Sequence, residues 1–290
     1  MKSKVYDCFC FFNELDILEL RLNILDPYVD YFVLSEANVT HVGTSKPYYF
    51  EENKDRFSKF MDKIIHLKIE DTPHDFTSLS TIENPESYDD GELNKIYRFI
   101  ETQTERFNVR TQPDYGRDFF QKECVRRGLE NCNDDDIIIF SDVDEIPNPH
   151  RLKDLSDLDQ SAHYTFNQNF YCYYLNVLKE KNWLGSRAAR FSQLRDYSYN
   201  ELRASPNTII EDGGWHFSFM GGPDEVYKKL TSYSAAHLAN SVVLGSVIQN
   251  INNNIDPFFR GRLETLPLDN SFPEYLLQNR DKYRHLIKDG

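Results

Sequence analysis

No part of this chain constrains its fold more than residues 134–147, which read Asp-Asp-Asp-Ile-Ile-Ile-Phe-Ser-Asp-Val-Asp-Glu-Ile-Pro. Residues 137–140 are all β-branched or aromatic, which is typical of a strand that is covered on both faces. Pro147 cannot extend the hydrogen-bonded ladder of a sheet. The stretch therefore predicts a buried strand that ends at a run of carboxylates.

Side chains alternate between the faces of a strand, so Asp142 and Asp144 point the same way, with Cα atoms about 7 Å apart. Their oxygens can reach one divalent ion and leave positions open for a diphosphate. We interpret the pair as a metal and nucleotide-sugar site. The alternative is a solvated acidic turn, which is at least as common for an isolated Asp-x-Asp. An EF-hand loop is disfavoured because Pro147 stands where that loop needs glycine.

Composition limits the partners of this protein. The chain has 290 residues, of which 40% are hydrophobic and 14% aromatic, so it can bury a full core in one large domain. Its net charge of -14 argues against nucleic acid and anionic membranes as partners, because both would be repelled. A nucleotide sugar would be repelled too, so its site needs a bound cation or a local cluster of arginine and lysine.

The cysteines and the apolar segments indicate a location. No cysteine spacing resembles a disulfide framework or a zinc site, and we expect reduced, buried thiols at Cys8, Cys10, Cys124, Cys132 and Cys172. No apolar run has the length of a signal peptide or of a membrane helix, which takes about 20 residues. We therefore expect a soluble, cytoplasmic protein with no transmembrane segment.

The first half of the chain alternates between strand and helix patterns. Apolar runs and helical spacing predict strands at 5–12, 31–34 and 63–69 and helices at 15–25 and 54–61. The polar residues 70–95 predict a surface excursion, and a helix at 118–132, opened by Arg117, leads into the strand at 137–141. This order predicts a mostly parallel sheet with helices on both faces.

The second half is rich in aromatic residues. We predict extended structure at 164–178, 183–191 and 215–219 and helices at 223–236 and 273–287, each helix with a proline in its first turn. In an open α/β sheet, ligands bind at the carboxyl ends of the strands. Asn13, Glu14, Glu36 and residues 142–145 are therefore expected along one edge of the sheet.

Four blocks of sequence resemble one known family. They are Phe-Phe-Asn-Glu at 11–14, Val-Leu-Ser-Glu-Ala-Asn at 33–38, Phe-Ser-Asp-Val-Asp-Glu-Ile-Pro at 140–147 and Gly-Gly-Trp-His-Phe-Ser at 213–218. In this order they resemble glycosyltransferase family 17, whose best-known members are β-1,4-mannosyl-glycoprotein β-1,4-N-acetylglucosaminyltransferases. The resemblance covers nearly the whole chain and is weak only towards the C-terminus.

The resemblance implies a GT-A-like single α/β domain, a UDP-sugar donor, a glycan acceptor, a divalent metal and inversion at the anomeric carbon. The domain would span 1–290, with a Rossmann-like nucleotide-sugar-binding half at 1–147. The acceptor-binding half and the C-terminal helices would occupy 148–290. N-acetylglucosamine is the leading donor sugar. Because the membrane anchor and stem of the eukaryotic members are missing, a microbial or viral enzyme that builds another glycan fits better.

In such a reaction UDP leaves as the acceptor attacks, so a cation must stabilise the charge on the leaving group. We predict that Asp142 and Asp144 hold Mn²⁺ or Mg²⁺, with Mn²⁺ preferred if His216 also ligates. Trp215 could cover a sugar or form a wall of the pocket. A histidine hydrogen-bonded inside the core is the alternative for His216.

A base must take the acceptor proton, and only a carboxylate or a histidine suits this task. The candidates are Glu145, Asp212, Asp224 and Glu225, and Asp212 or Asp224 is favoured. Asp224 has an alternative role, because acids at a helix start also stabilise the helix. Glu145 faces away from the aspartate pair on an extended strand and would instead orient the substrate.

The remaining candidates bind the donor and the acceptor. Asn13, Glu14 and Glu36 follow strands and are predicted near the nucleoside. Phosphate charge could be countered by Arg117, Arg187 or Arg190. Aromatic density predicts a saccharide platform at Tyr173 and Trp183. Surface salt bridges and a sheet core are the respective alternatives.

Two other functions stay open at this point. A metal-dependent phosphoester hydrolase would use the same aspartates, but a two-metal site needs clustered histidine and aspartate ligands, and the eight histidines are scattered. The other alternative is a catalytically silent glycan-binding protein.

Overall fold

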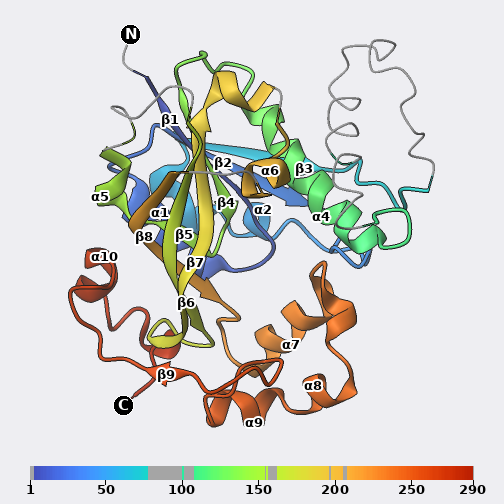
Figure 1. Ribbon diagram of the computed structural model, residues 1–290, viewed down its shortest axis with the longest axis vertical. Coiled ribbons are helices and arrows are strands. Elements are labelled where there is room, and N and C mark those ends of the chain that lie inside the picture. The colour runs from blue at the N-terminus through green and yellow to red at the C-terminus, as the bar shows by residue number, and fades with distance from the viewer. Residues whose placement is uncertain are drawn as a thin grey trace.

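The predicted buried strand lies in the interior of a mixed sheet. The computed structural model describes residues 3–77, 100, 108–153, 155, 162–195, 197–204 and 208–289. Among these residues the strands follow one another in the order β3 (Ile64–Ile69), β2 (Tyr31–Ala37), β1 (Val5–Cys10), β4 (Ile137–Asp142), β7 (Val177–Arg190), β6 (Tyr164–Cys172), β8 (Thr208–Ser218) and β5 (Glu145–Pro147). A short strand, β9 (Glu264–Thr265), pairs with β7 (Figure 1).

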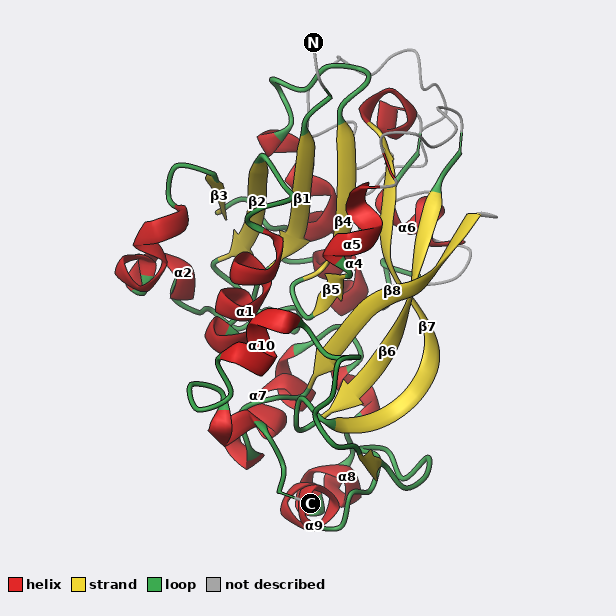
Figure 2. Ribbon diagram, turned by 90° about the vertical axis from the view of Figure 1, so that its left-hand side faces the viewer, coloured by secondary structure: helices red, strands yellow, loops and turns green. Residues whose placement is uncertain are grey.

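Helices lie on both faces of the sheet and beyond one end of it (Figure 2). The described α-helices are α1 (Leu15–Leu25), α2 (Tyr49–Glu52), α4 (Pro113–Glu123), α5 (Pro149–Leu152), α6 (Tyr199–Ala204), α7 (Pro223–Ser232), α8 (Ser241–Gly245), α9 (Val247–Asn252) and α10 (Glu274–Gln278). The 3-10 turns are η1 (Lys54–Phe60), η3 (Cys124–Gly128), η5 (Phe191–Arg195), η6 (Ala236–Leu238) and η7 (Arg284–Leu286). Helices α7, α8 and α9 form a separate group below the sheet in the view of Figure 1.

The predicted α/β class is confirmed, and the parallel pairing is concentrated in the first half of the chain. β1 pairs in parallel with β2 and β4, and β2 pairs in parallel with β3. The second half adds antiparallel pairs between β4 and β7, β6 and β7, and β5 and β8, together with a parallel pair between β6 and β8. A short turn joins β6 to β7, and such a connection requires antiparallel strands.

Alternate residues of the central strands enter two different cores. Phe9 of β1 packs in the cluster that contains Leu18 of α1, whereas Cys8 packs in the cluster that contains Val125 of η3 and Tyr199 of α6. This alternation follows from the two-residue period of a strand. Both faces of β1 and β4 are therefore covered, as the unbroken apolar run of β4 predicts.

A buried arginine fixes the turn that follows β4. Arg21 of α1 pairs with Asp7 of β1 at 2.6 Å, and neither side chain is exposed. The same guanidinium donates to Oγ of Ser141 at 2.7 Å and to the backbone carbonyl oxygens of Asp142 at 3.1 Å and Glu145 at 2.9 Å. The position of the acidic turn is thus set by a charged network inside the protein.

Two of the predicted helices have other bounds. The helix predicted at 118–132 begins earlier, at Pro113, because proline suits the first turn of a helix, and its last part is the 3-10 turn η3. The helix predicted at 223–236 begins at Pro223 but ends at Ser232, because Tyr233 has an extended backbone.

Three other segments differ from the prediction, and a fourth is mostly outside the described residues. The helix predicted at 273–287 is wrong as a continuous element, since only α10 and the turn η7 form there. The helix predicted at 54–61 is the 3-10 turn η1. The extended segment predicted at 164–178 is broken at Tyr173, whose φ of 70° turns the chain. Most of the excursion predicted at 70–95 lies outside the described residues.

The five cysteines are all free thiols. Cys8, Cys124 and Cys172 are buried, and Cys10 and Cys132 are partly buried, so the predicted reduced state is consistent with their positions. Among the described residues, no helix combines the length and the apolar character that a membrane span requires.

Candidate functional site

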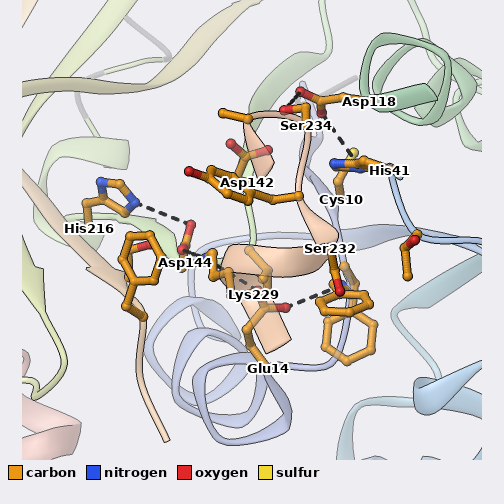
Figure 3. Close-up of a pocket in the computed structure, with 18 of the residues that line it drawn as sticks. Cys10, Glu14, His41, Asp118, Asp142, Asp144, His216, Lys229, Ser232 and Ser234 are labelled. Atoms are coloured by element: carbon orange, nitrogen blue, oxygen red, sulfur yellow. Dashed lines mark hydrogen bonds and ion pairs between the residues drawn. The ribbon is translucent and has the colours of Figure 1, made fainter. Parts of the chain in front are cut away.

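A pocket of about 380 Å³ opens where β1 and β4 end and α7 packs against them (Figure 3). The pocket is lined by residues from the β1–α1 turn, the segment after β2, helix α4, the acidic turn after β4, strands β6 to β8 and the segment that follows α9. They include Phe11, Phe12, Glu14, Thr40, His41, Asp118, Lys122, Asp142, Asp144, Phe170, Lys179, Trp183, His216, Lys229, Tyr233, Phe258 and Arg260. The expected gathering of polar strand ends at one edge is thus observed for Glu14, Asp142 and Asp144.

Asp144 is held by a lysine and faces a histidine. Nζ of Lys229, in α7, lies 2.7 Å from Oδ2 of Asp144, and Nε2 of His216 lies 3.5 Å from Oδ1 (Figure 3). Burial raises the pKa of Asp144, but Lys229 and His216 outweigh this effect and hold that pKa well below its usual range. Asp144 is therefore a permanent anion at the wall of the pocket.

Asp142 is more open than Asp144 and has weaker partners. Its side chain is 38% exposed, and its nearest cations are Lys122 at 3.5 Å and Arg203 at 3.7 Å. Lys122 is also held by Asp118, one helical turn away, at 3.0 Å. Burial lowers the pKa of Lys122, but the nearby carboxylates of Asp118 and Asp142 outweigh this effect. The pKa is therefore raised above its usual value, and Lys122 stays charged.

Glu145 is buried beneath the pocket and is fully engaged. Its Oε1 accepts from Arg203 at 2.8 Å and from Nε1 of Trp183 at 2.9 Å. Burial raises the pKa of Glu145, but Arg203, His216 and the bond from Trp183 lower it to about 2. The carboxylate of Glu145 thus positions a protein cation, Arg203, and the indole of the pocket wall.

His216 stands in an aromatic wall. Its ring stacks on Phe170 at 4.1 Å and lies 4.9 Å from the ring of Trp183. Nδ1 of His216 is buried without a hydrogen-bond partner among the described residues. Two of the predicted site residues, His216 and Trp183, belong to this wall. His216 faces Asp144 and Trp183 donates to Glu145, so the wall contacts the acidic turn at both residues.

A second polar network lies on the α4 side of the pocket. Asp118 accepts from Oγ of Ser234 at 2.9 Å, and Nε2 of His41 lies 3.9 Å from its carboxylate (Figure 3). Nε2 of His41 also contacts Oε1 of Gln121 at 3.2 Å. Burial raises the pKa of Asp118, but Lys122 and His41 lower it below its usual value. The sequence does not reveal this network, because its members come from separate segments with no shared motif.

Three predicted donor-binding residues lie outside the pocket lining. Glu36 is fully buried and contacts Lys46 at 3.3 Å and His66 at 3.1 Å, so it serves an internal ion network. Arg117 is buried and donates to the backbone carbonyl oxygens of residues 41 and 74. Trp215 faces the opposite side of β8 from His216, and its Nε1 donates to the carbonyl oxygen of Ser271.

Asn13 and the other two arginines are also engaged elsewhere. The amide of Asn13 donates to Glu225 at 2.5 Å, which links the β1–α1 turn to α7 beside the pocket. Arg187 is buried and donates to the backbone carbonyl oxygen of Arg203 at 3.2 Å. Arg190 donates to the carbonyl oxygen of Asp135 at 2.6 Å. None of these three residues is part of the pocket lining.

The favoured bases and one acceptor residue also lie away from the pocket lining. Asp212 is exposed near the middle of β8, where it contacts Asn148 and Arg151. Asp224 is exposed in the first turn of α7. The ring of Tyr173 is buried, and its hydroxyl donates to the carbonyl oxygen of Ile255 at 3.0 Å. These positions favour structural roles for all three.

The sequence analysis also missed the cations of the site. Net charge indicated that the site would need a bound cation or a cluster of arginine and lysine. Lys122, Arg203 and Lys229 form such a cluster around the acidic turn. Each comes from a different helix, and Lys229 lies 85 residues from Asp144 in the sequence. No local pattern marks such a pairing.

The fold and the pocket define an α/β protein with a binding site at its strand ends, built from an acidic turn, three cations and an aromatic wall. Comparison with known families identifies the class further. The family model for glycosyltransferase family 17 matches residues 1–89 and 76–255. The chain therefore belongs to glycosyltransferase family 17, as its motifs predict.

Curated relatives agree with this membership. The chain is 22% identical over 315 residues to the β-1,4-mannosyl-glycoprotein 4-β-N-acetylglucosaminyltransferase of Rattus norvegicus, covering 96% of this chain and 53% of the relative. The protein of the same name from Homo sapiens is 22% identical over 319 residues, with 95% and 53% covered. The chain thus spans about half the length of these relatives.

Among solved structures, HddC from Yersinia pseudotuberculosis complexed with GMP-PN is similar over 79% of this chain and 97% of that chain. The sequence identity is 12% and the TM-score is 0.31. A likeness this distant carries no argument about function.

Proposed function

We propose that this protein is a metal-dependent, inverting glycosyltransferase that moves a sugar, N-acetylglucosamine first among candidates, from a UDP-sugar to a glycan hydroxyl. One observation carries the proposal. Asp142 and Asp144, from the most specific motif of the family, line one pocket together with an aromatic wall and several cations. The curated relatives are named as N-acetylglucosaminyltransferases, which supports the choice of N-acetylglucosamine. Inversion is carried over from the family resemblance.

The pocket offers distinct surfaces for the parts of a nucleotide sugar. Phe11 and Phe12 follow β1 and provide apolar surface for a nucleoside. The acidic turn with Lys122 occupies the middle, where a diphosphate needs counter-charge. Trp183 and His216 form the wall where the sugar and the acceptor would stack.

The residues fit a divalent ion that the substrate helps to hold. Asp142 and Asp144 supply hard oxygen donors, the kind that Mg²⁺ and Mn²⁺ prefer. Among the described residues, no group of three histidine, cysteine or acidic side chains is placed to hold a metal alone. An ion here would therefore complete its shell with water and donor phosphates, as Mg²⁺ commonly does in phosphate sites. When bound, it would act as a Lewis acid on the leaving diphosphate.

The protein cations would share the task of stabilising UDP as it leaves. Lys122 lines the pocket and is held beside Asp142 by Asp118. Arg203 is outside the pocket lining, where Glu145 holds it and it balances Asp142 from behind at 3.7 Å. Such fixed cations in a partly desolvated site stabilise developing negative charge without having to reorganise. Glu145 acts in this scheme as a positioning residue for Arg203 and Trp183.

The base must be a carboxylate or a histidine that reaches the acceptor. Besides the aspartate pair, the described groups of this kind in the pocket lining are Glu14, His41, Asp118 and His216. We place the base among these residues instead of at Asp212 or Asp224, because a base has to contact the acceptor proton.

A cytoplasmic location is also proposed, and the five free thiols support a reducing compartment.

UDP release tests the proposal. The purified chain is incubated with a panel of UDP-sugars and simple glycan acceptors, with MnCl₂ or with EDTA. We expect acceptor-dependent UDP release with one donor, lost in EDTA and reduced about 100-fold or more in Asp142→Asn. Asp62→Asn, an exposed surface change of the same chemistry, is the matched control and should match wild type.

The outcomes separate the alternatives. Release of UMP and sugar 1-phosphate instead of UDP would indicate a phosphoester hydrolase, because such an enzyme breaks a P–O bond and leaves the glycosidic bond intact. Binding of a glycan without release of UDP or UMP from any donor would indicate a catalytically silent glycan-binding protein. Equal release by wild type and Asp142→Asn would contradict the proposed role of the acidic turn.

A further inference from the structure

Lys229 occupies the place that a divalent ion would need at Asp144. Its Nζ lies 2.7 Å from Oδ2 of Asp144 and 3.5 Å from Oε1 of Glu14, so the lysine bridges the turns that follow β1 and β4 (Figure 3). The other oxygen, Oδ1, faces His216 at 3.5 Å. Both oxygens of Asp144 are engaged, and only 5% of its side chain is exposed.

An ion that enters the pocket by itself therefore meets one open carboxylate, that of Asp142. A single carboxylate competes poorly with bulk water for Mg²⁺ or Mn²⁺, because these ions lose their water reluctantly. The ammonium groups of Lys122 and Lys229 also repel a second positive charge at short range. In the absence of other anions, the acidic turn is a weak cation site.

Lys229 is free to change partners, whereas Lys122 is not. The side chain of Lys229 lines the pocket, is 20% exposed and has a flexible stem. Lys122 is only 10% exposed and is locked to Asp118 one turn away on α4. A diphosphate in the pocket would offer Lys229 oxygens of higher charge than a carboxylate.

We propose that Lys229 is an exchangeable counter-ion: it pairs with Asp144 in the empty site and transfers this pairing to the donor diphosphate. The transfer frees Asp144 for the divalent ion. Lys229 thereby becomes a donor-binding residue, and the ion and the nucleotide bind as a coupled pair. The inference rests on the proposed function and deepens it by naming how the site is loaded. Linkage requires that each ligand strengthens the binding of the other by the same factor.

Titration calorimetry on the full chain measures this coupling without turnover. MnCl₂ is titrated with and without saturating UDP, and UDP is titrated with and without MnCl₂. We expect UDP to tighten Mn²⁺ binding by about tenfold or more in wild type, with the same factor in reverse. In Lys229→Met, Mn²⁺ alone should bind about tenfold more tightly, and UDP should bind more weakly.

Two further variants control for charge and packing. Lys228→Met removes the same charge one residue away, where the lysine lies 4.0 Å from Glu225 and does not line the pocket. It should leave the affinity for Mn²⁺ alone unchanged. Lys229→Arg keeps the charge and should keep the coupling. Thermal melting of each variant shows whether it is folded.

The result that overturns the inference is equal Mn²⁺ affinity with and without UDP in wild type. That titration decides even if Lys229→Met does not fold. An unchanged affinity for Mn²⁺ alone in folded Lys229→Met would overturn it as well. The proposed function fails separately, when wild type binds no UDP under either condition.

Discussion

The guanidinium of Arg21 donates to the backbone carbonyl oxygen of Glu145 at 2.9 Å and so ties helix α1 to the acidic turn of the site. The same group bonds the carbonyl oxygen of Asp142 and is balanced by the buried carboxylate of Asp7. Carbonyl groups at the end of a strand need donors when they are buried. Arg21 provides them, and thereby couples the stability of the fold to the geometry of the site.

Arg21→Met should lower the free energy of unfolding by about 3 to 5 kcal/mol, because it leaves Asp7 buried and unpaired and the turn carbonyls without a donor. Urea unfolding followed by circular dichroism measures the loss. Arg56→Met is the control, since Arg56 pairs with Asp16 and Glu19 but is 33% exposed. It should cost about 1 kcal/mol or less. Similar losses in the two variants would show that the buried network of Arg21 contributes no more to the free energy of unfolding than the exposed ion pairs of Arg56.

The acid stability of the protein should depend on Glu145. Its pKa is about 2 in the folded protein and about 4.3 in an unfolded chain, so the folded state favours the charged form. A lowered pKa contributes stability that is present above pH 5 or so and is lost as the pH falls towards about 2.

Between pH 6 and pH 3, wild type should therefore lose about 2 kcal/mol more stability than Glu145→Gln, which has no such titration. Urea unfolding at both pH values measures the difference. The variant should be the less stable protein at pH 6, because Arg203 and Trp183 lose a charged partner. Glu130→Gln, at an exposed position, should retain the wild-type pH dependence. Identical pH slopes for wild type and Glu145→Gln would contradict this assignment.

The acidic turn could be located from sequence because its signal is local. An apolar run that stops at acids and a proline marks both a strand and its end. The turn lies beside the end of β1 because neighbouring parallel strands of a sheet have their carboxyl ends at the same edge. The same local logic predicted Glu14 at the pocket, whereas His216 was predicted from the block of sequence that resembles the family. The local sequence did not reveal that the charge of Asp144 is balanced by an ion pair with Lys229, because Lys229 comes from a helix far along the chain.

The predicted site residues that lie outside the pocket lining also have physical explanations. Trp215 and His216 are neighbours on β8, so only one of them can face the pocket, and the sequence does not say which. Asp212 lies four residues before His216, which is about 13 Å along a strand, too far for both to serve one reaction centre. Arg117 and Glu36 are charged residues that the fold uses internally, and charge alone does not distinguish such roles.

Trp183 should affect the acceptor more than the nucleotide. Its indole forms the wall next to His216 and is held by Glu145. Trp183→Ala should lower kcat/KM for the acceptor about tenfold through lost stacking, while the Kd of UDP changes little. Trp183→Phe keeps an aromatic wall without the hydrogen bond and should be intermediate. Steady-state kinetics with varied acceptor, together with UDP calorimetry, checks both. A parallel loss of UDP affinity would place Trp183 at the nucleotide instead.

The position of the base can be tested by comparing acids inside and outside the pocket. Asp212 and Asp224 are exposed and do not line it, so Asp212→Asn and Asp224→Asn should keep kcat within about threefold of wild type. Asp118 lines the pocket, and if it takes the acceptor proton, Asp118→Asn should lower kcat by about 100-fold or more with UDP binding retained. Glu14→Gln provides the same comparison at the turn between β1 and α1, which also lines the pocket. A 100-fold loss of kcat in Asp212→Asn or Asp224→Asn would instead identify that residue as the base. The pocket would then have to extend to it during turnover.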